Sequence, residues 1–307
     1  SREITPDTDP SHIVRLVLTS GTTGTSKAVP LTLASLDQRK RMNEQAGDNG
    51  TAMSLMGIGS LAGGNRVLYA AWNGRPFATP ANRGDWASWL SLVQTVRPSR
   101  LGGSPAQLDA FFATAWNKRV RLDFLSQVTS AGAVFPAVLA ERIRKVTRAD
   151  LVSVYGSTEA GRVASKTVVT DSNPFELGKL DDEVQYQIVD DNGAELGVNE
   201  IGLLRVKTPA MSSSYHQDQQ ADATFYKDGW FYPGDEASVT ADGRILLAGR
   251  TSEFINAGGV KINPTYVDQA ISRLPNILDG ASCGVENSSG VTQLVFAYVA
   301  PTDFDAK

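Results

Sequence analysis

The chain has 307 residues, with 29 basic and 33 acidic side chains and a formal net charge of −4. This balance excludes a basic surface over the whole chain, so we expect no nucleic-acid partner. Hydrophobic residues make up 41% and charged residues 20%, which predicts a folded protein of about two domains without the ~18-residue apolar run of a membrane span. A single cysteine, Cys283, and two histidines argue against a disulfide framework and against His–Cys metal clusters. We therefore expect a cytoplasmic protein that acts on a small molecule.

The first half of the chain alternates strand and helix patterns. Apolar or β-branched runs predict strands over residues 13–18, 127–129 and 151–154. Helical spacing and composition, in some cases with an aspartate or proline at the start, predict helices over residues 34–45, 85–96, 105–116 and 136–146. Residues 51–71 predict a strand, a tight loop and a helix. This alternation predicts an α/β protein with a mixed sheet-and-helix core and a partly parallel sheet.

The second half changes in character. Short strands over residues 183–189, 202–207 and 244–247, separated by turn signals, predict a β-rich subdomain at about residues 178–248. A helix over residues 264–274 and a strand over 293–299 predict the start of a small α+β C-terminal domain. We therefore expect a large domain over residues 1–251 and the beginning of a second over 252–307. Cys283 is expected to be buried there as a small apolar side chain.

The strongest local signal is the segment TSGTTGTSK at residues 19–27. Its glycines let the backbone approach an anion, its hydroxyls and amides can donate to phosphate oxygens, and its lysine adds charge. Ser26 stands where the common nucleotidase P-loop has glycine before the lysine, so that motif is excluded. The alternative is a flexible Ser/Gly linker. Its position directly after a predicted strand favours a phosphate-binding loop.

Five blocks in order resemble the motifs of the adenylate-forming, AMP-binding superfamily, which includes acyl- and aryl-CoA synthetases, peptide-synthetase adenylation domains and luciferases. The blocks are TSGTTGTSKAVPLT from residue 19, SAGAVF from 130, YGSTEAG from 155, DGWFYPGD from 228 and GRTSEFINAGGVKINP from 249. One block alone could arise by chance, whereas five in the same order are specific. The resemblance covers most of the chain and implies that superfamily's fold and its use of ATP and Mg²⁺.

The resemblance implies a role for each matching residue. The residues implied to hold the ATP phosphates are Thr19, Ser20, Gly21, Thr22, Thr23, Gly24, Thr25 and Lys27. Those implied to line the adenine and the adjoining nucleotide are Gly132, Ala133, Val134, Tyr155, Gly156 and Ser157, with Tyr155 stacking on the base. Thr158 would contact the α-phosphate and Glu159 would bind Mg²⁺, so that Thr158, Glu159 and Lys27 form the catalytic set. Asp235 and Arg250 would bind the ribose.

Further residues are implied to serve the second half-reaction. Glu253 stands at the superfamily's hinge position, which usually holds aspartate or lysine. Gly258, Gly259 and Lys261 form a glycine loop that would contact a thiol-bearing cosubstrate, although Lys261 could equally be a solvated surface side chain. Taken singly, each of these residues also has an ordinary structural explanation, such as a turn, a helix cap or a surface ion pair.

The resemblance implies an ATP-dependent acid–thiol ligase. A carboxylic acid substrate would be converted to acyl-AMP with release of pyrophosphate, and the acyl group would pass to coenzyme A. The alternatives are transfer to the phosphopantetheine of an acyl carrier protein, a nucleotide-binding module without ligase activity, and the luciferase-like branch. The phosphate loop begins at residue 19, and no glycine-rich motif with a catalytic lysine occurs near residue 307. We therefore expect a fragment that adenylates acids slowly.

Overall fold

The computed structural model describes residues 9–19, 26–45, 51–79, 84–169, 172–257, 260–271, 273–274, 277, 279–287 and 291–301. The chain divides into two compact units, which are described separately. The first comprises Ser1–Gln187 and Arg205–Pro233, and the second comprises Ile188–Leu204 and Gly234–Lys307. The boundary between residues 251 and 252 that the sequence suggests stays a prediction.

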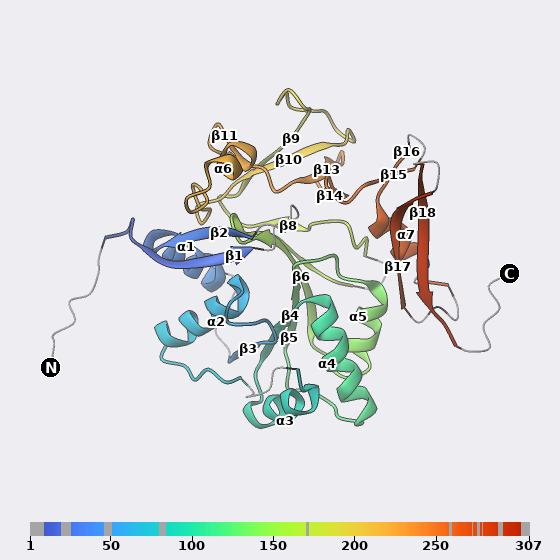
Figure 1. The fold of residues 1–307 in the computed structure, drawn as a ribbon. Helices are drawn as coiled ribbons and strands as arrows, with labels where there is room; N and C mark the ends of the chain where they lie inside the picture. Colours follow the sequence, from blue (N-terminus) through green and yellow to red (C-terminus); the bar gives the residue numbers. More distant parts are fainter. Residues whose placement is uncertain are drawn as a thin grey trace. The chain divides into compact units, whose positions relative to one another are not determined.

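A six-stranded sheet organises the first unit (Figure 1). Its strands in spatial order are β3 (Ala52–Ser54), β4 (Arg100–Gly103), β5 (Gln127–Ala131), β6 (Asp150–Ser157), β7 (Gly161–Thr167) and β8 (Lys179–Leu180). The first four are parallel, and β7 and β8 continue the sheet in antiparallel fashion. The predicted partly parallel α/β sheet is therefore confirmed.

Four of the helices in this unit accompany the sheet, and three of them begin at a side-chain cap. They are α2 (Leu61–Trp72), α3 (Trp86–Val96) and α4 (Pro105–Asn117), which are capped, and α5 (Ala137–Arg144), which is not. Asp85 accepts from the Ala87 amide at the start of α3, and Ser104 and Gln107 form a reciprocal capping box before α4. One apolar core joins α3, α4 and α5 to β3–β6, with Phe111 and Phe112 fully buried within it.

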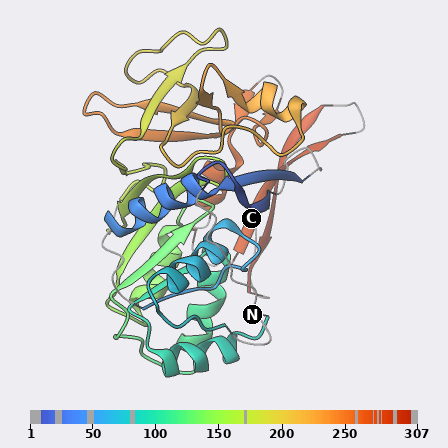
Figure 2. The same cartoon turned by 90° about the vertical axis from the view of Figure 1, so that its left-hand side faces the viewer.

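A second, smaller core lies in the same unit. It forms between the antiparallel pair β1 (Ile13–Thr19) and β2 (Lys27–Thr32), helix α1 (Leu33–Gln45) and helix α6 (Gln219–Phe225). Helix α1 also packs against β2 and β7 (Figure 2). Tyr215 is buried in this core although it lies almost two hundred residues from α1 in the sequence. This packing carries the segment around Tyr215 towards the β6–β7 turn.

The β-rich region predicted at about residues 178–248 contains strands from both units. Strands β9 (Gln185–Val189) and β10 (Gly202–Lys207) each contain a point where the chain passes between the units. In the first unit, β11 (Tyr226–Lys227) pairs with β12 (Trp230–Phe231), and β12 pairs with Val206 of β10. In the second, β13 (Asp235–Val239) pairs with β10 at Gly202 and Leu203 and with β14 (Ile245–Arg250).

The end of the chain forms small elements of the second unit. These are β15 (Ile255–Ala257), β16 (Val260–Ile262), α7 (Pro264–Ile271), β17 (Asp279–Glu286) and β18 (Thr292–Val299). Strands β17 and β18 form a two-stranded antiparallel ribbon. Cys283 on β17 is exposed, so the expectation that it is buried is wrong. A strand in a narrow ribbon has no layer on its outer face to cover such a side chain.

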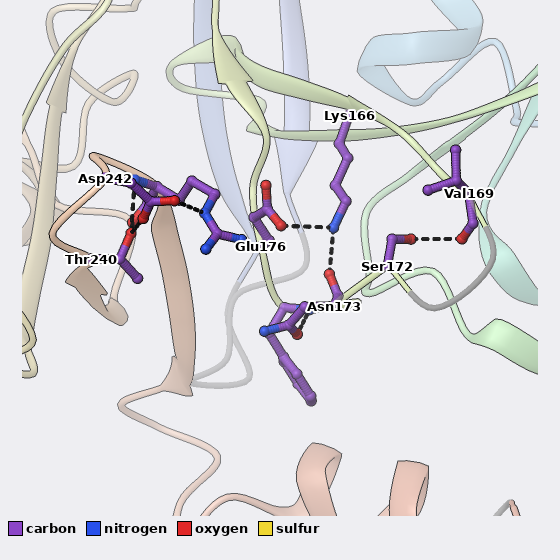
Figure 3. A network of polar contacts seen from close by, with 9 residues as sticks. Lys166, Val169, Ser172, Asn173, Glu176, Thr240 and Asp242 are labelled. Carbon is purple, nitrogen blue, oxygen red and sulfur yellow. Dashed lines mark hydrogen bonds and ion pairs between the residues drawn. The ribbon is translucent and has the colours of Figure 1, made fainter.

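Polar contacts fix the segment that joins β7 to β8 (Figure 3). Lys166 Nζ donates to the Asn173 carbonyl oxygen at 2.5 Å and pairs with the Glu176 carboxylate at 3.3 Å. The Ser172 hydroxyl donates to the Val169 carbonyl oxygen at 2.9 Å. Both side chains of the Lys166–Glu176 pair are largely buried, so this pair holds the connection against the end of the sheet.

Within the described residues, none of the helices has the length and apolar character needed to span a membrane.

The core predicts a sharp contrast between two positions on α4. Phe111→Ala removes a fully buried ring, and we expect the free energy of unfolding to fall by about 3–5 kcal/mol. Trp116→Ala, on the same helix but 53% exposed, should change it by only about 0.5 kcal/mol. Urea unfolding monitored by circular dichroism measures both. Equal losses for the two variants would contradict the placement of this helix.

Candidate functional site

The predicted adenine-side residues lie at the carboxyl edge of the parallel strands. Ala131, the last residue of β5, pairs with Val154 of β6, so Gly132 and Tyr155 follow at neighbouring places on the same edge. Gly132 has a φ of +94°, and a Cβ there would meet nothing within 4 Å. Gly132 and Ala133 are exposed. The structure thus brings the 132–134 loop and Tyr155 to one open sheet edge, where α/β proteins commonly bind ligands.

The YGSTEAG segment makes the tight reversal from β6 into β7. The register shifts between Tyr155 and Gly156, and Ser157 then pairs with Gly161. A Cβ on Gly156 would lie 2.1 Å from the Gly161 carbonyl oxygen, and Gly161 itself has a φ of +77°. Both positions therefore require glycine. The Ala160 amide donates to the Ser157 hydroxyl at 3.0 Å, which closes the turn around Thr158 and Glu159.

Glu159 is buried, with 8% of its surface exposed. Its Oε1 accepts a hydrogen bond from the Tyr215 hydroxyl at 2.8 Å. Burial raises the pKa of Tyr215, and the negative charge of Glu159 raises it further. The phenol therefore keeps its proton and acts as a hydrogen-bond donor to the carboxylate.

The carbonyl oxygens of three consecutive turn residues accept hydrogen bonds from helix α1 and from the stretch that follows β10. Arg39 Nη2 donates to the Thr158 oxygen at 2.9 Å and to the Glu159 oxygen at 3.3 Å. The Ser212 amide also donates to the Glu159 oxygen, at 2.8 Å, and the Thr208 hydroxyl donates to the Ala160 oxygen at 2.6 Å. These hydrogen bonds hold the turn through its backbone and do not engage the side chains of Thr158 and Glu159.

Arg39 is 3% exposed, which is unusual for a charged side chain. Burial lowers its pKa to about 10, against the opposing influence of nearby groups that include Tyr69 and Glu159. The guanidinium therefore remains charged at neutral pH. It places a positive charge close to Glu159 in a region of low solvent access.

The sequence does not single out Arg39 or Tyr215. Arg39 stands in the charge-rich run DQRKR and looks like part of a solvated helix face. One signal was available: Ser35, Leu36, Arg39 and Met42 recur at helical spacing, and all four are buried. An arginine within such a buried stripe indicates a partner in the interior. Tyr215 gives no local signal, because its role comes from tertiary packing.

One carboxylate, Glu159, is available to bind a metal ion at this turn. Among the residues that the structure describes, no group of three or more His, Cys, Asp and Glu side chains could hold a metal ion. Mg²⁺ is commonly bound through one or two carboxylates together with substrate phosphates. A single carboxylate with one oxygen already hydrogen-bonded to Tyr215 fits that pattern, since the second oxygen can serve as a ligand.

The lysine of the predicted phosphate loop has an aromatic neighbour. Lys27, the first residue of β2, places its Nζ 4.8 Å from the centroid of the Phe225 ring. Thr19 at the end of β1 donates to the Lys27 carbonyl oxygen at 3.4 Å, so both ends of the loop lie together. The loop residues Ser20, Gly21, Thr22, Thr23, Gly24 and Thr25 lie outside the described residues.

The two predicted ribose ligands form a pair in the second unit. Asp235 begins β13 and Arg250 ends β14, and the hairpin register places them directly opposite each other. Arg250 Nε donates to Asp235 Oδ1 at 3.1 Å, and Asp235 is 5% exposed. The arrangement explains how residues fifteen positions apart can act at one place.

The predicted hinge and the residues after it also lie in the second unit. Glu253 is exposed in the turn after β14, and its amide donates to the Arg250 carbonyl oxygen at 3.0 Å. Lys261 contacts two neighbouring side chains. Its Nζ pairs with the Glu236 carboxylate and lies 4.4 Å from the centroid of the Phe254 ring. Gly258 and Gly259 lie outside the described residues.

Comparison with known proteins gives consistent matches. The family described as AMP-binding enzyme matches residues 1–216. A 4-chlorobenzoate–CoA ligase of Arthrobacter is 28% identical over 280 residues, covering 88% of this chain and 53% of the relative. An indoleacetate–CoA ligase of Aromatoleum aromaticum is 26% identical over 309 residues, covering 97% of this chain and 59% of the relative. The chain thus spans about half to three-fifths of the length of these relatives.

Solved structures share the fold. The crystal structure of ATP-bound MatB from Rhodopseudomonas palustris superposes with a TM-score of 0.84 at 20% identity, covering 99% of this chain and 61% of that chain. The O-succinylbenzoate coenzyme A synthetase MenE of Bacillus subtilis, in complex with AMP, gives a TM-score of 0.82 at 18% identity, covering 96% of this chain and 61% of that chain. The expected fold class is therefore confirmed.

The tightness of the β6–β7 reversal gives a prediction. Gly156→Ala forces a Cβ against the Gly161 carbonyl oxygen, and we expect the free energy of unfolding to fall by about 1–3 kcal/mol. Gly59→Ala is the matched control, because a Cβ at Gly59 meets nothing within 4 Å. That variant should be neutral or slightly stabilised. Thermal and urea unfolding measure both, and an unaffected Gly156→Ala protein would show that the turn is looser than described.

Proposed function

We propose a ligase function from one premise: the chain belongs to the AMP-binding enzyme family. In the proposed reaction, a carboxylate oxygen attacks the α-phosphorus of ATP, and the bond to the bridging oxygen breaks to release pyrophosphate. The acyl group of the resulting acyl-AMP then passes to the thiol of coenzyme A, with release of AMP. Curated relatives that are CoA ligases support coenzyme A as the acceptor. A carrier protein's phosphopantetheine is the second candidate, since the solved neighbours include an adenylation–carrier pair with a TM-score of 0.81.

The observation that carries this proposal is the turn at the end of β6. Tyr155, Thr158 and Glu159 stand in the order that the family motif requires, at the carboxyl edge of a parallel sheet, beside the open 132–134 loop. An aromatic ring at such an edge offers a stacking surface for a base, at about 1–3 kcal/mol. The loop and the ring together are suited to a planar heterocycle.

The residues of the turn would meet the triphosphate. Thr158 supplies a hydroxyl donor for the α-phosphate oxygens, where negative charge accumulates in the transition state. Glu159 would bind Mg²⁺ through the oxygen that Tyr215 does not engage. When bound, the metal ion neutralises charge on the phosphate oxygens. The backbone hydrogen bonds from Arg39, Ser212 and Thr208 would keep Thr158 and Glu159 in position without reorganisation.

Lys27 would stabilise the β- and γ-phosphates together with the loop from Thr19. Its ammonium group now lies over Phe225, and a cation–π contact of about 0.5–1 kcal/mol is weak enough to be exchanged for a phosphate. Asp235 would accept hydrogen bonds from the ribose hydroxyls, with Arg250 donating to the same sugar. We propose residues 1–251 as the AMP-binding domain that presents these groups.

The thiol-transfer step would require a rotation of the segment after Glu253. A turn residue with an exposed side chain can absorb a large change in backbone dihedral angles. Gly258, Gly259 and Lys261 would then approach the thiol-bearing cosubstrate. Lys261 would first have to leave Glu236, and such an exchange suits a half-exposed ammonium group better than a buried one.

Acid-dependent exchange of labelled pyrophosphate into ATP tests the proposed reaction. The purified protein is assayed with Mg²⁺ and a panel of aryl, arylacetic, fatty and dicarboxylic acids. We expect exchange with at least one acid, and formation of an acyl-CoA when coenzyme A is added. Binding of ATP without exchange for any acid would instead support a nucleotide-binding module.

Truncation of Asp235 tests the assignment of the ribose site. A carboxylate that accepts two ribose hydroxyls loses two charge-assisted hydrogen bonds of about 1.5–3 kcal/mol each. Asp235→Ala should therefore weaken AMP binding by at least about tenfold in calorimetry, together with some fall in the melting temperature of the free protein because Arg250 loses its buried partner. The matched control is Asp242→Ala, which removes an exposed Asp–Arg pair from the same β13–β14 hairpin. Normal AMP affinity in Asp235→Ala, with early unfolding, would make Asp235 structural.

A further inference from the structure

We propose that Tyr215 and Arg39 are positioning residues that present a single oxygen of Glu159 to the magnesium ion carried by ATP. The inference rests on the proposed function, because it concerns how the same turn holds its metal. Neither residue belongs to the five sequence blocks. Both come from segments far from the turn, α1 and the stretch before α6.

Tyr215 is held rigidly enough to fix the direction of its hydroxyl. Its ring is 4% exposed and meets the rings of Phe225 and Tyr226 edge to face, with centroids 5.9 and 5.6 Å away. Its amide donates to Asp222 Oδ1 at 2.6 Å. A phenol fixed at both ring and backbone can donate in only one direction, and that direction is Glu159 Oε1 at 2.8 Å.

Arg39 holds the backbone that carries Glu159. It binds two consecutive carbonyl oxygens of the turn, those of Thr158 and Glu159, as a planar guanidinium can. Its charge also accompanies the buried carboxylate of Glu159, which would otherwise carry an uncompensated desolvation cost. Arg39 therefore sets the backbone of the turn and places a positive charge near the Glu159 carboxylate.

These contacts restrict how Glu159 can bind a metal ion. Because Oε1 accepts from Tyr215 and is directed towards that hydroxyl, Oε2 is the less engaged oxygen, and we expect the metal to bind through it alone. Monodentate carboxylate ligation suits the small octahedral Mg²⁺, whereas bidentate ligation is typical of Ca²⁺. One carboxylate beside a guanidinium is a poor site for a free cation. The metal should therefore bind only when ATP phosphates complete its shell.

Calorimetry with and without the metal separates this role from a general structural one. ATP is titrated into the protein in the presence of Mg²⁺ and again in EDTA, and the ratio of the two dissociation constants measures the contribution of the metal. In Tyr215→Phe the freed carboxylate can turn towards Arg39. We expect the ratio to fall by about tenfold, the equivalent of one hydrogen bond to a charged group, with ATP affinity in EDTA unchanged.

Tyr266→Phe is the control for the loss of a phenol hydroxyl. The Tyr266 hydroxyl donates to the Leu247 carbonyl oxygen at 2.9 Å, and both residues belong to the second unit. Removing that hydroxyl should leave the ratio as in the unmodified protein. Arg39→Lys keeps the charge but replaces the Nη2 donor that binds both carbonyl oxygens with an ammonium group on a shorter side chain, and we expect a reduced ratio with a modest fall in melting temperature.

The outcomes are distinct. A Tyr215→Phe protein with an unchanged ratio overturns the inference and leaves the proposed function standing. Equal losses of ATP affinity in Mg²⁺ and in EDTA overturn it as well, because they indicate a purely structural role. Tight binding of Mg²⁺ without nucleotide also contradicts it. If the unmodified protein does not bind ATP in either condition, the proposed function fails, and the inference fails with it.

Discussion

The reversal of the chain between β6 and β7 is the constraint on which the candidate site depends. Four parallel strands, β3 to β6, end at one edge, and the chain must reverse there into the antiparallel strand β7 without displacing Tyr155 from that edge. Gly156 and Gly161 make this possible, since a side chain at Gly156 would collide with the Gly161 carbonyl oxygen. The tight turn then projects Thr158 and Glu159 beyond the strands. Its carbonyl oxygens are bound by Arg39, Ser212 and Thr208, so its position is set by helix α1 and by the stretch that follows β10.

Much of the fold follows from local sequence patterns. Helices α3 and α4 begin at Asp85 and Ser104, where side-chain caps satisfy free amides, and both boundaries can be predicted to within a residue or two. Strands β5 (QVTSA) and β6 (DLVSVYGS) are predictable in part, because the expected strands at residues 127–129 and 151–154 lie within them. Strand β7 is not, because its sequence GRVASKT is largely polar, and it becomes a strand only by pairing with β6 and β8. Cys283 was placed wrongly for a related reason. Its exposure depends on how many layers cover β17, which sequence patterns do not reveal.

The candidate site divides in the same way. Motif order predicts site roles for Tyr155, Thr158, Glu159, Asp235 and Arg250, and the register of β13 with β14 explains why the last two form a pair. Motif order does not find the groups that hold them. Arg39 stands in a charge-rich run that looks like a solvated helix face, and Tyr215 has no local signature. The structure nevertheless places Arg39 on the backbone of the turn and Tyr215 on the Glu159 carboxylate. Lys261 does belong to a predicted motif, but the motif does not predict its partner. Its ion pair with Glu236 forms through a tertiary contact. The residues that the resemblance assigns to the nucleotide stand in sequence motifs, whereas Arg39 and Tyr215 are brought beside them by tertiary packing.

We propose that the β6–β7 turn presents Glu159 to a nucleotide-bound metal ion beside Tyr155. A crystal structure of the protein with an ATP analogue and Mn²⁺, with the metal located by its anomalous scattering, tests this placement. We expect one peak at about 2.1 Å from a single Glu159 oxygen, with Tyr215 still bonded to the other oxygen and the adenine against Tyr155. A metal ion bound away from Glu159, or an adenine placed away from Tyr155, would contradict it.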